Sequence, residues 1–399
     1  MSSGGLSKTR LDRMHDVLAG HVDRGLLPGL VTLISRRGEQ HVDVIGSTGF
    51  EAGPMRRDTI FRIASLTKPI TAVATLILIE ECRLRLDEPV DRLLPELADR
   101  QVLISLDAPV TDTVPAKRPI TVRDLLTFRA GWGLIFDDVP IRQAIDELEL
   151  ASFGPPRPSQ FTADEWLRRL GTLPLMHQPG EKWMYNTGSY VLGVLIERAS
   201  GQPLESFLRE RVFEPLGMRD TGFHVPADRI DRLATAYLAD HETGELSLDD
   251  PAGPDSAWSR PPTLPDAGGG LVSTIDDYLA FGQMMANEGR YNGERLLSRL
   301  SVEAMTTDQL TPAQKAVSGF FPGYFDARGW GFGVSVTTKQ VDGTAVPGQF
   351  GWDGGAGTSW YVDPREDMQA ILFTQRAGFP LLSPVYRDFW TSVYQSIDD

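Results

Sequence analysis

Ser65 and Lys68 are the two residues of this sequence whose types and spacing most clearly allow chemistry. On a helix, positions i and i+3 share one face and lie about 5–6 Å apart, so the hydroxyl and the amine can meet. A serine hydroxyl becomes a good nucleophile when a neighbouring base takes its proton, and a lysine can be that base when burial lowers its pKa. The spacing alone also fits a helix-capping serine followed by a solvated lysine.

The segment that begins at Ser65 has the pattern of a buried helix up to about Glu81. Its apolar positions form one wide face: Ile70, Val73, Ala74, Ile77 and Leu78. Pro69 falls in the first turn, where backbone N–H groups have no partner within the helix. We therefore expect Ser65 at the helix start, where the positive end of the dipole stabilises negative charge developing on an attacked carbonyl oxygen. Cys82 ends the apolar run and is expected in the core.

Composition removes several classes of function. The chain has 399 residues and a formal net charge of −15, which argues against nucleic acid as a partner. Its single cysteine excludes an intrachain disulfide and a thiolate zinc cluster. The six histidines lack the HExxH spacing, and no G-x-S-x-G elbow, P-loop or dinucleotide fingerprint is present. We predict a protein with no metal and no cofactor, acting on a small molecule.

The first residues lack the apolar core of a signal peptide. The most apolar run, residues 70–79, is ten residues long, well below the roughly 18–20 needed to cross a bilayer. These features predict a cytoplasmic protein without a membrane partner.

Periodicity predicts strands near both ends of the chain and helices between them. A helix at 10–25 precedes a hairpin of strands 30–34 and 42–45, and a helix at 275–287 precedes strands at 331–337, 359–362 and 368–374 and a final helix at 384–397. In the middle, helices at 122–127, 163–170 and 190–200 alternate with proline-rich loops at 155–158 and 261–262. This pattern predicts an α/β domain from residues 1–104 and 266–399 and a mainly helical domain at 105–265.

Phe61–Lys68, followed by Asp87-Glu88-Pro89-Val90, resembles the serine β-lactamase/penicillin-binding-protein superfamily, in particular its class C β-lactamase and family VIII carboxylesterase branch. The resemblance continues in order over about 300 residues, through these segments: Ile120–Thr127 with Ala130-Gly131, Gln178–Thr187, Pro215–Met218, Gly269–Thr274 and Gly351–Gly355. It implies an α/β plus all-α fold of the β-lactamase/transpeptidase type, an antiparallel sheet flanked by helices with a helical insertion.

The resemblance also implies roles for particular residues. Tyr185 would stand near Ser65 and Lys68 and relay the proton, first as a base and then as an acid to the leaving group. Whether the lysine or the phenolate takes the proton stays open. The N–H groups of Ser65 and Gly355 would form an oxyanion hole, beside a strand edge that Gly354 and Gly355 leave free of side chains.

Two positions depart from the lactamase pattern. The second motif usually reads Tyr-x-Asn, whereas here Thr187 takes the third place and the asparagine is Asn186. The third motif usually begins with Lys or His, and here Trp352 stands there, which removes a partner for a substrate carboxylate and suits a neutral ester. We expect these residues, Asp353, Gly354 and the aromatic side chains Trp132 and Trp330 to form the substrate pocket.

The sequence thus predicts a serine hydrolase that cleaves small carboxylic esters, with short acyl groups favoured, through an acyl-enzyme on Ser65, with Lys68 and Tyr185 handling the proton. The same machinery would also serve a β-lactamase, a D-amino-acid peptidase of the DD-carboxypeptidase kind, or an acyltransferase. A binding module that has lost catalysis is a further alternative, although it would have no need for all three residues.

Overall fold

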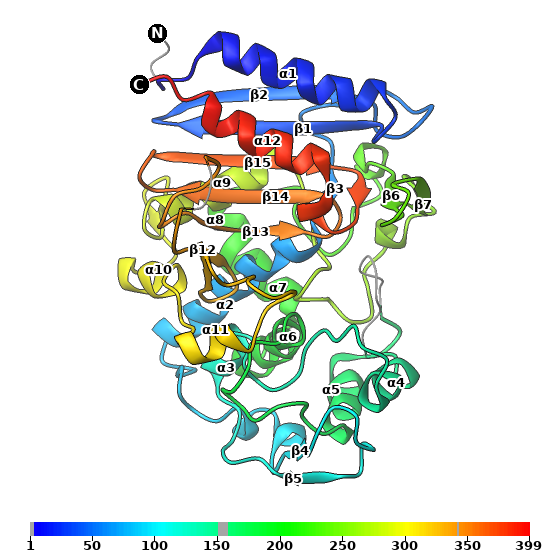
Figure 1. The fold of residues 1–399 in the computed structure, drawn as a ribbon, viewed down its shortest axis with the longest axis vertical. Coiled ribbons are helices and arrows are strands. Elements are labelled where there is room, and N and C mark those ends of the chain that lie inside the picture. Colours follow the sequence, from blue (N-terminus) through cyan, green and yellow to red (C-terminus); the bar gives the residue numbers. More distant parts are fainter. Residues whose placement is uncertain (1–3, 151–158, 341–342) are drawn as a thin grey trace.

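The computed structural model describes residues 4–150, 159–340 and 343–399. In this part of the chain the main sheet has seven strands, all paired antiparallel, in the order β11-β12-β13-β14-β15-β1-β2. Their bounds are β1 Gly29–Arg36, β2 Glu39–Gly46, β11 Arg328–Trp330, β12 Ser335–Thr337, β13 Phe350–Gly354, β14 Thr358–Asp363 and β15 Met368–Thr374. The sheet is therefore built from both ends of the chain, as Figure 1 shows by its blue and orange strands.

Helices cover both faces of the sheet, and the strand side chains alternate between two cores. On one face, α1 (Lys8–Asp23) and α12 (Pro384–Gln395) pack on Leu30, Ile34 and Leu372. Figure 1 shows these two helices side by side in front of the sheet. On the other face, Val31 and Phe373 belong to the larger core, which includes α2 (Thr67–Glu80) and α9 (Ile275–Ala286).

The hairpin between β1 and β2 forms as predicted, because Arg37 and Gly38 both take positive φ, as a tight two-residue turn between twisted strands requires.

The middle of the chain is mostly helical. Its helices are α3 Val122–Leu126, α4 Pro140–Glu147, α5 Ala163–Thr172, α6 Thr187–Ser200, α7 Leu204–Leu208 and α8 Glu214–Leu216, with a π-helical turn at Arg209–Phe213. Helices α10 Arg299–Met305 and α11 Pro312–Ala316 follow α9. Single turns of 3-10 helix lie at Ala64–Leu66, Val90–Arg92, Pro95–Leu97, Ile230–Arg232, Ala257–Ser259 and Pro380–Leu382.

Small sheets complete the fold. They pair β3 Phe61–Arg62 with β8 Val272–Ser273, β4 Gln101–Leu103 with β5 Thr113–Pro115, β9 Arg290–Tyr291 with β10 Glu294–Arg295, and β6 Ala236–Ala239 with β7 Leu246–Asp250 and β16 Arg376–Ala377. An antiparallel sheet flanked by helices, with a helical region in the middle of the chain, is the predicted fold class. The division at residues 104/105 and 265/266 stays a prediction.

Two sequence expectations were wrong in detail. Cys82 is exposed, because α2 ends at Glu80 and Cys82 lies in the following turn with φ of 58°. The single strand expected at 331–337 is also different in the structure, because residues 331–334 connect β11 to β12 and only Ser335–Thr337 is strand. The predicted loop at Pro155–Pro158 falls outside the described residues. Within the described ranges, no helix combines the length and apolarity of a membrane span.

Candidate active site

Ser65 lies in the single 3-10 turn Ala64–Leu66 that leads directly into α2. A hydrogen bond from α9 holds this turn in place, because the hydroxyl of Tyr278 donates to the carbonyl oxygen of Leu66 at 2.8 Å. Further along α2, the hydroxyl of Thr71 donates to the carbonyl oxygen of Ala267 at 2.7 Å. Pro69 is the third residue of α2, in the first turn, as predicted. The serine is therefore held at the start of a buried helix, where its side chain faces a cavity.

Lys68 points from α2 to Ser65. Its Nζ is 2.9 Å from the Ser65 Oγ and 2.6 Å from the carbonyl oxygen of Gly268. The side chain is 1% exposed. This burial lowers the pKa of Lys68 to about 7, although the nearby carboxylate of Asp266 acts to raise it. A lysine with this pKa is partly neutral at pH 7 and can accept a proton.

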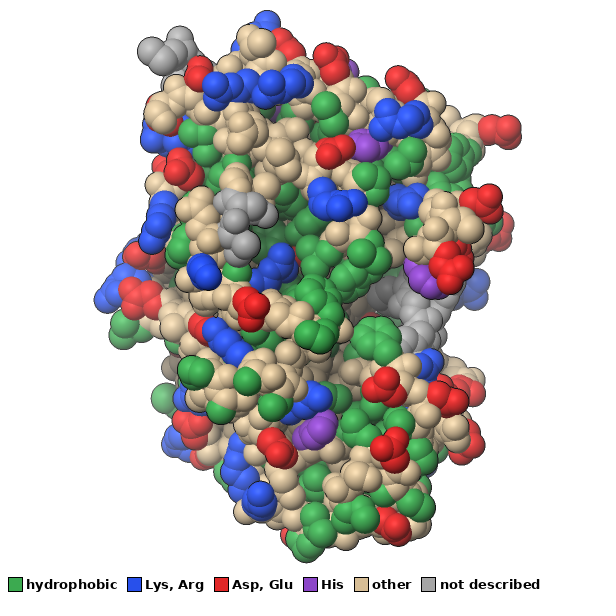
Figure 2. All heavy atoms as spheres, viewed as in Figure 1, with side chains coloured by type: hydrophobic (Ala, Val, Ile, Leu, Met, Phe, Trp, Pro, Cys, Tyr) green, Lys and Arg blue, Asp and Glu red, His purple; other side chains and the backbone are tan. Residues whose placement is uncertain are grey.

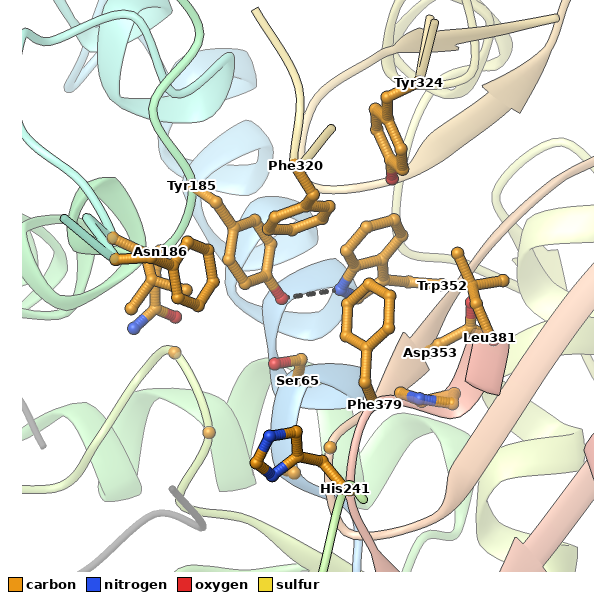
Figure 3. Close-up of a pocket in the computed structure, with 18 of the residues that line it drawn as sticks. Ser65, Tyr185, Asn186, His241, Phe320, Tyr324, Trp352, Asp353, Phe379 and Leu381 are labelled. Carbon is orange, nitrogen blue, oxygen red and sulfur yellow. Dashed lines mark hydrogen bonds between the residues drawn. The ribbon is translucent and has the colours of Figure 1, made fainter. Parts of the chain in front are cut away.

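Tyr185 completes the cluster from the loop before α6. The ring centroid of Tyr185 is 4.7 Å from the Lys68 Nζ. The indole Nε1 of Trp352 donates to the Tyr185 hydroxyl at 2.8 Å, and Figure 3 shows the two side chains pointing toward each other above Ser65. Burial raises the pKa of Tyr185 above its ordinary value, while hydrogen bonds with Ser65 and Trp352 act in the opposite direction. Tyr185 is therefore a neutral phenol near pH 7.

The end of β13 forms one wall of the site. Strand β12 pairs with β13 only at Phe350 and Gly351, so the residues that follow in β13 run past the end of β12 and form an open edge. A Cβ on Gly354 would come within 2.3 Å of the Ile63 carbonyl oxygen, so glycine lets the strand pack against the turn that carries Ser65. A Cβ on Gly355 would meet no atom within 4 Å, and Gly355 lines the same cavity as Ser65.

The cavity above Ser65 has a volume of about 540 Å³ and mainly aromatic and aliphatic walls. Two of its apolar side chains reach the surface, Phe136 at 59% and Phe379 at 42% exposure. Figure 2 shows apolar side chains gathered around a hollow near the middle of this face. Besides Ser65, Tyr185, Trp352 and Gly355, the residues that line the cavity include Leu134, Asn186, Tyr190, Phe320, Tyr324, Arg328, Asp353 and Leu381. A cavity of this size and character fits an apolar small molecule.

The predicted pocket residues take different positions. Asn186 lines the cavity, with φ of 91°, whereas Thr187 begins α6 and does not line it. Asp353 lines the cavity, but its carboxylate already accepts hydrogen bonds from three hydroxyl groups, those of Ser359, Tyr361 and Tyr386. Gly354 packs behind the cavity wall.

The two predicted tryptophans do not line the cavity. Trp330 is fully buried, with its ring centroid 4.7 Å from that of Trp352 and 6.2 Å from that of Tyr185. It supports these two rings from behind. Trp132 is also buried, and its ring lies 5.3 Å from the Arg100 guanidinium carbon.

Sequence reasoning missed the loop that holds Lys68. The Gly268 N–H donates to the Asp266 Oδ1 at 2.7 Å, and the Gly268 carbonyl oxygen accepts from Lys68. Tyr190 of α6 also hydrogen-bonds to Asp266. The segment Gly269–Thr274 was noted for its resemblance, but no local pattern shows that the preceding aspartate lies close to a lysine nearly 200 residues away. Phe320, Tyr324 and Phe379 were likewise not predicted to line the cavity.

The fold and this arrangement define the class of protein. A family model described as Beta-lactamase matches residues 14–388, and the chain belongs to that family. Proteins of this fold that are similar to the chain include esterases and acyltransferases, and the chain is an enzyme of the serine hydrolase class.

Individual relatives cover almost all of the chain. Protein Rv1367c of Mycobacterium tuberculosis is 40% identical over 361 residues, which cover 88% of this chain and 87% of the relative. Esterase EstB of Burkholderia gladioli is 32% identical over 396 residues, covering 92% and 91%. Among solved structures, EstCE1, described as a hydrolase with promiscuous acyltransferase activity, matches with a TM-score of 0.78 and 26% identity, covering 97% of this chain and 99% of its own.

Proposed function

We propose that this protein is a carboxylesterase that forms an acyl-enzyme on Ser65. The observation that carries the proposal is the 2.9 Å contact between the Ser65 Oγ and the Nζ of a buried lysine whose pKa burial lowers to about 7. A neutral amine at this distance can take the serine proton as the oxygen attacks.

The proposed reaction has two stages. Ser65 Oγ bonds to the ester carbonyl carbon while its proton passes to Lys68, and negative charge develops on the carbonyl oxygen. The backbone N–H groups of Ser65 and Gly355 would stabilise that charge. The proton then goes, through the phenol of Tyr185, to the departing alcohol oxygen. Water releases the acyl group by the same steps in reverse order.

The cavity supports an ester rather than a charged lactam or peptide. Trp352 occupies the place where the lactamases have a cation, and it donates its N–H to Tyr185. The walls next to Ser65 are apolar, from Leu134, Phe320 and Phe379. The similarity to Esterase EstB supports the same choice.

The proposal is tested by assaying the purified protein with short nitrophenyl esters and a chromogenic cephalosporin, beside the Ser65→Ala variant. We expect ester cleavage that is lost in the variant, with slow or no lactam turnover. Fast lactam turnover without ester cleavage would reverse the assignment. Ester cleavage that persists in Ser65→Ala would exclude the proposed nucleophile.

An acyltransferase is the second candidate, because an acyl-enzyme can pass its acyl group to an alcohol. The apolar cavity of about 540 Å³ favours it, since its walls can hold an alcohol better than water. The similarity to EstCE1 is consistent with this possibility. Adding a primary alcohol to the ester assay separates the two: a transferase yields mainly the new ester, and a hydrolase mainly the free acid.

A further inference from the structure

In the loop from Asp266 to Gly270, Gly268 forms hydrogen bonds with both Asp266 and Lys68. The carboxylate of Asp266 accepts a hydrogen bond from the Gly268 N–H at 2.7 Å, and the Gly268 carbonyl oxygen accepts one from the Lys68 Nζ at 2.6 Å. The loop is closed by the Gly270 N–H, which donates to the Asp266 carbonyl oxygen at 2.8 Å. The Asp266 side chain therefore fixes the oxygen that orients the lysine.

Asp266 also acts on Lys68 by its charge. Burial raises the pKa of Asp266, and the charge of Lys68 is the largest effect that lowers it. In return, the carboxylate raises the pKa of Lys68 against its burial. The other groups facing these two are neutral near pH 7: the Tyr185 ring over the amine, the Ser65 hydroxyl beside it and the Tyr190 hydroxyl on the carboxylate. Asp266 is thus the anionic neighbour of the lysine among the described residues.

We propose that Asp266 is a positioning residue of the Ser65 centre, which holds the Gly268 carbonyl against the Lys68 amine and stabilises the ammonium that forms when Lys68 accepts the serine proton. This inference rests on the proposed function.

Acylation creates a positive charge on Lys68, which the carboxylate of Asp266 would stabilise. Ser65 Oγ forms a bond to the carbonyl carbon, the carbonyl π pair moves onto oxygen, and the serine proton goes to Lys68. A neutral pair thereby becomes an ammonium and an oxyanion in a buried site. The oxyanion has the backbone N–H groups, and the ammonium has Asp266 behind the Gly268 peptide. The intermediate then collapses, the carbonyl re-forms, and the alcohol leaves with the proton.

Asp266→Asn separates the two contributions, because the amide oxygen can still accept from the Gly268 N–H while the charge is lost. Removing the carboxylate lowers the pKa of Lys68 further. We expect the acid limb of kcat/KM for nitrophenyl acetate to move about one unit to lower pH, and the plateau rate to fall about tenfold as the ammonium loses its partner. The rate at which an organophosphonate labels Ser65 should show the same shift of its pH profile.

Two further variants make the test specific. Asp277→Asn is the matched control: Asp277 is another mostly buried carboxylate, on α9, which accepts from the Asp220 N–H and the Thr221 hydroxyl. It should leave the acid limb in place. Tyr190→Phe removes a hydrogen bond that favours the charged form of Asp266. Tyr190→Phe should move the acid limb of kcat/KM in the same direction as Asp266→Asn does, by a smaller amount. If Asp266→Asn folds poorly, Tyr190→Phe still tests the inference.

The outcomes distinguish the inference from the proposed function. A slower Asp266→Asn enzyme with an unmoved acid limb would show a structural role only and overturn the inference. A limb that moves to higher pH would overturn it as well. Either result, together with an inactive Ser65→Ala variant, leaves the proposed esterase intact. Full activity in Ser65→Ala would contradict the esterase itself, independently of Asp266.

Discussion

The indole N–H of Trp352 donates a 2.8 Å hydrogen bond to the phenolic oxygen of Tyr185. A neutral donor thus occupies the place where the β-lactamases carry a cation. It favours the phenolate far less than an ammonium would, while burial raises the pKa of Tyr185. In the proposed mechanism, the lysine, whose pKa burial lowers to about 7, is therefore the base for Ser65, and the phenol is the acid.

The pH profile of the wild-type enzyme should follow Lys68. The pKa of Lys68 is lowered from 10.5 to about 7, so the amine is protonated and inactive below pH 7 and neutral above it. We expect kcat/KM for a neutral ester to rise through pH 7 and reach a plateau by about pH 8. A profile that rises only near pH 10, measured with a nitrophenyl ester in constant-ionic-strength buffers, would contradict a Lys68 base whose pKa is lowered by burial.

Tyr185→Phe should lower kcat by about 100-fold or more, because the leaving group loses its proton donor. The fold should be retained, since the ring packs edge-on against Phe128 and Phe320 whether or not it carries a hydroxyl. Steady-state kinetics and a thermal melt measure the two effects together. Unchanged kcat would remove Tyr185 from the mechanism.

Trp352→Phe keeps an aromatic wall but removes the donor to Tyr185. We expect a fall in kcat of about five- to tenfold, the effect of losing one hydrogen bond worth about 1 kcal/mol.

Trp352→Lys should instead restore a cation beside the phenol and raise the rate with a cephalosporin relative to a nitrophenyl ester. A ratio of the two rates that stays constant in Trp352→Lys would show that this position does not select the substrate.

Two neighbouring glycines offer a matched pair of alanine substitutions. A Cβ at Gly354 would press on the Ile63 carbonyl oxygen next to Ser65, so Gly354→Ala should lower the free energy of unfolding by about 1–3 kcal/mol. A Cβ at Gly355 meets open space and should leave stability nearly unchanged while narrowing the approach to the proposed oxyanion hole. Urea denaturation of both variants checks this order; equal losses of stability would contradict it.

The sequence was sufficient for features that depend on local periodicity or on a recognisable motif. The three-residue spacing of Ser65 and Lys68 and the apolar face of α2 follow from helix geometry, and the resemblance placed Tyr185. Trp330 was expected in the pocket wall, yet an aromatic residue in a motif region can equally support the wall from behind, as it does here. The contact of Asp266 with the Lys68 loop depends on tertiary packing between distant segments and leaves no local signal.

The central claim, that Ser65 is the nucleophile, is tested most directly by mass spectrometry after reaction with an organophosphonate. We predict one adduct, on the peptide that contains Ser65, which is absent in Ser65→Ala and forms much more slowly in Lys68→Ala. An adduct on a different serine, or ester cleavage that continues at full rate once Ser65 is fully labelled, would contradict the account.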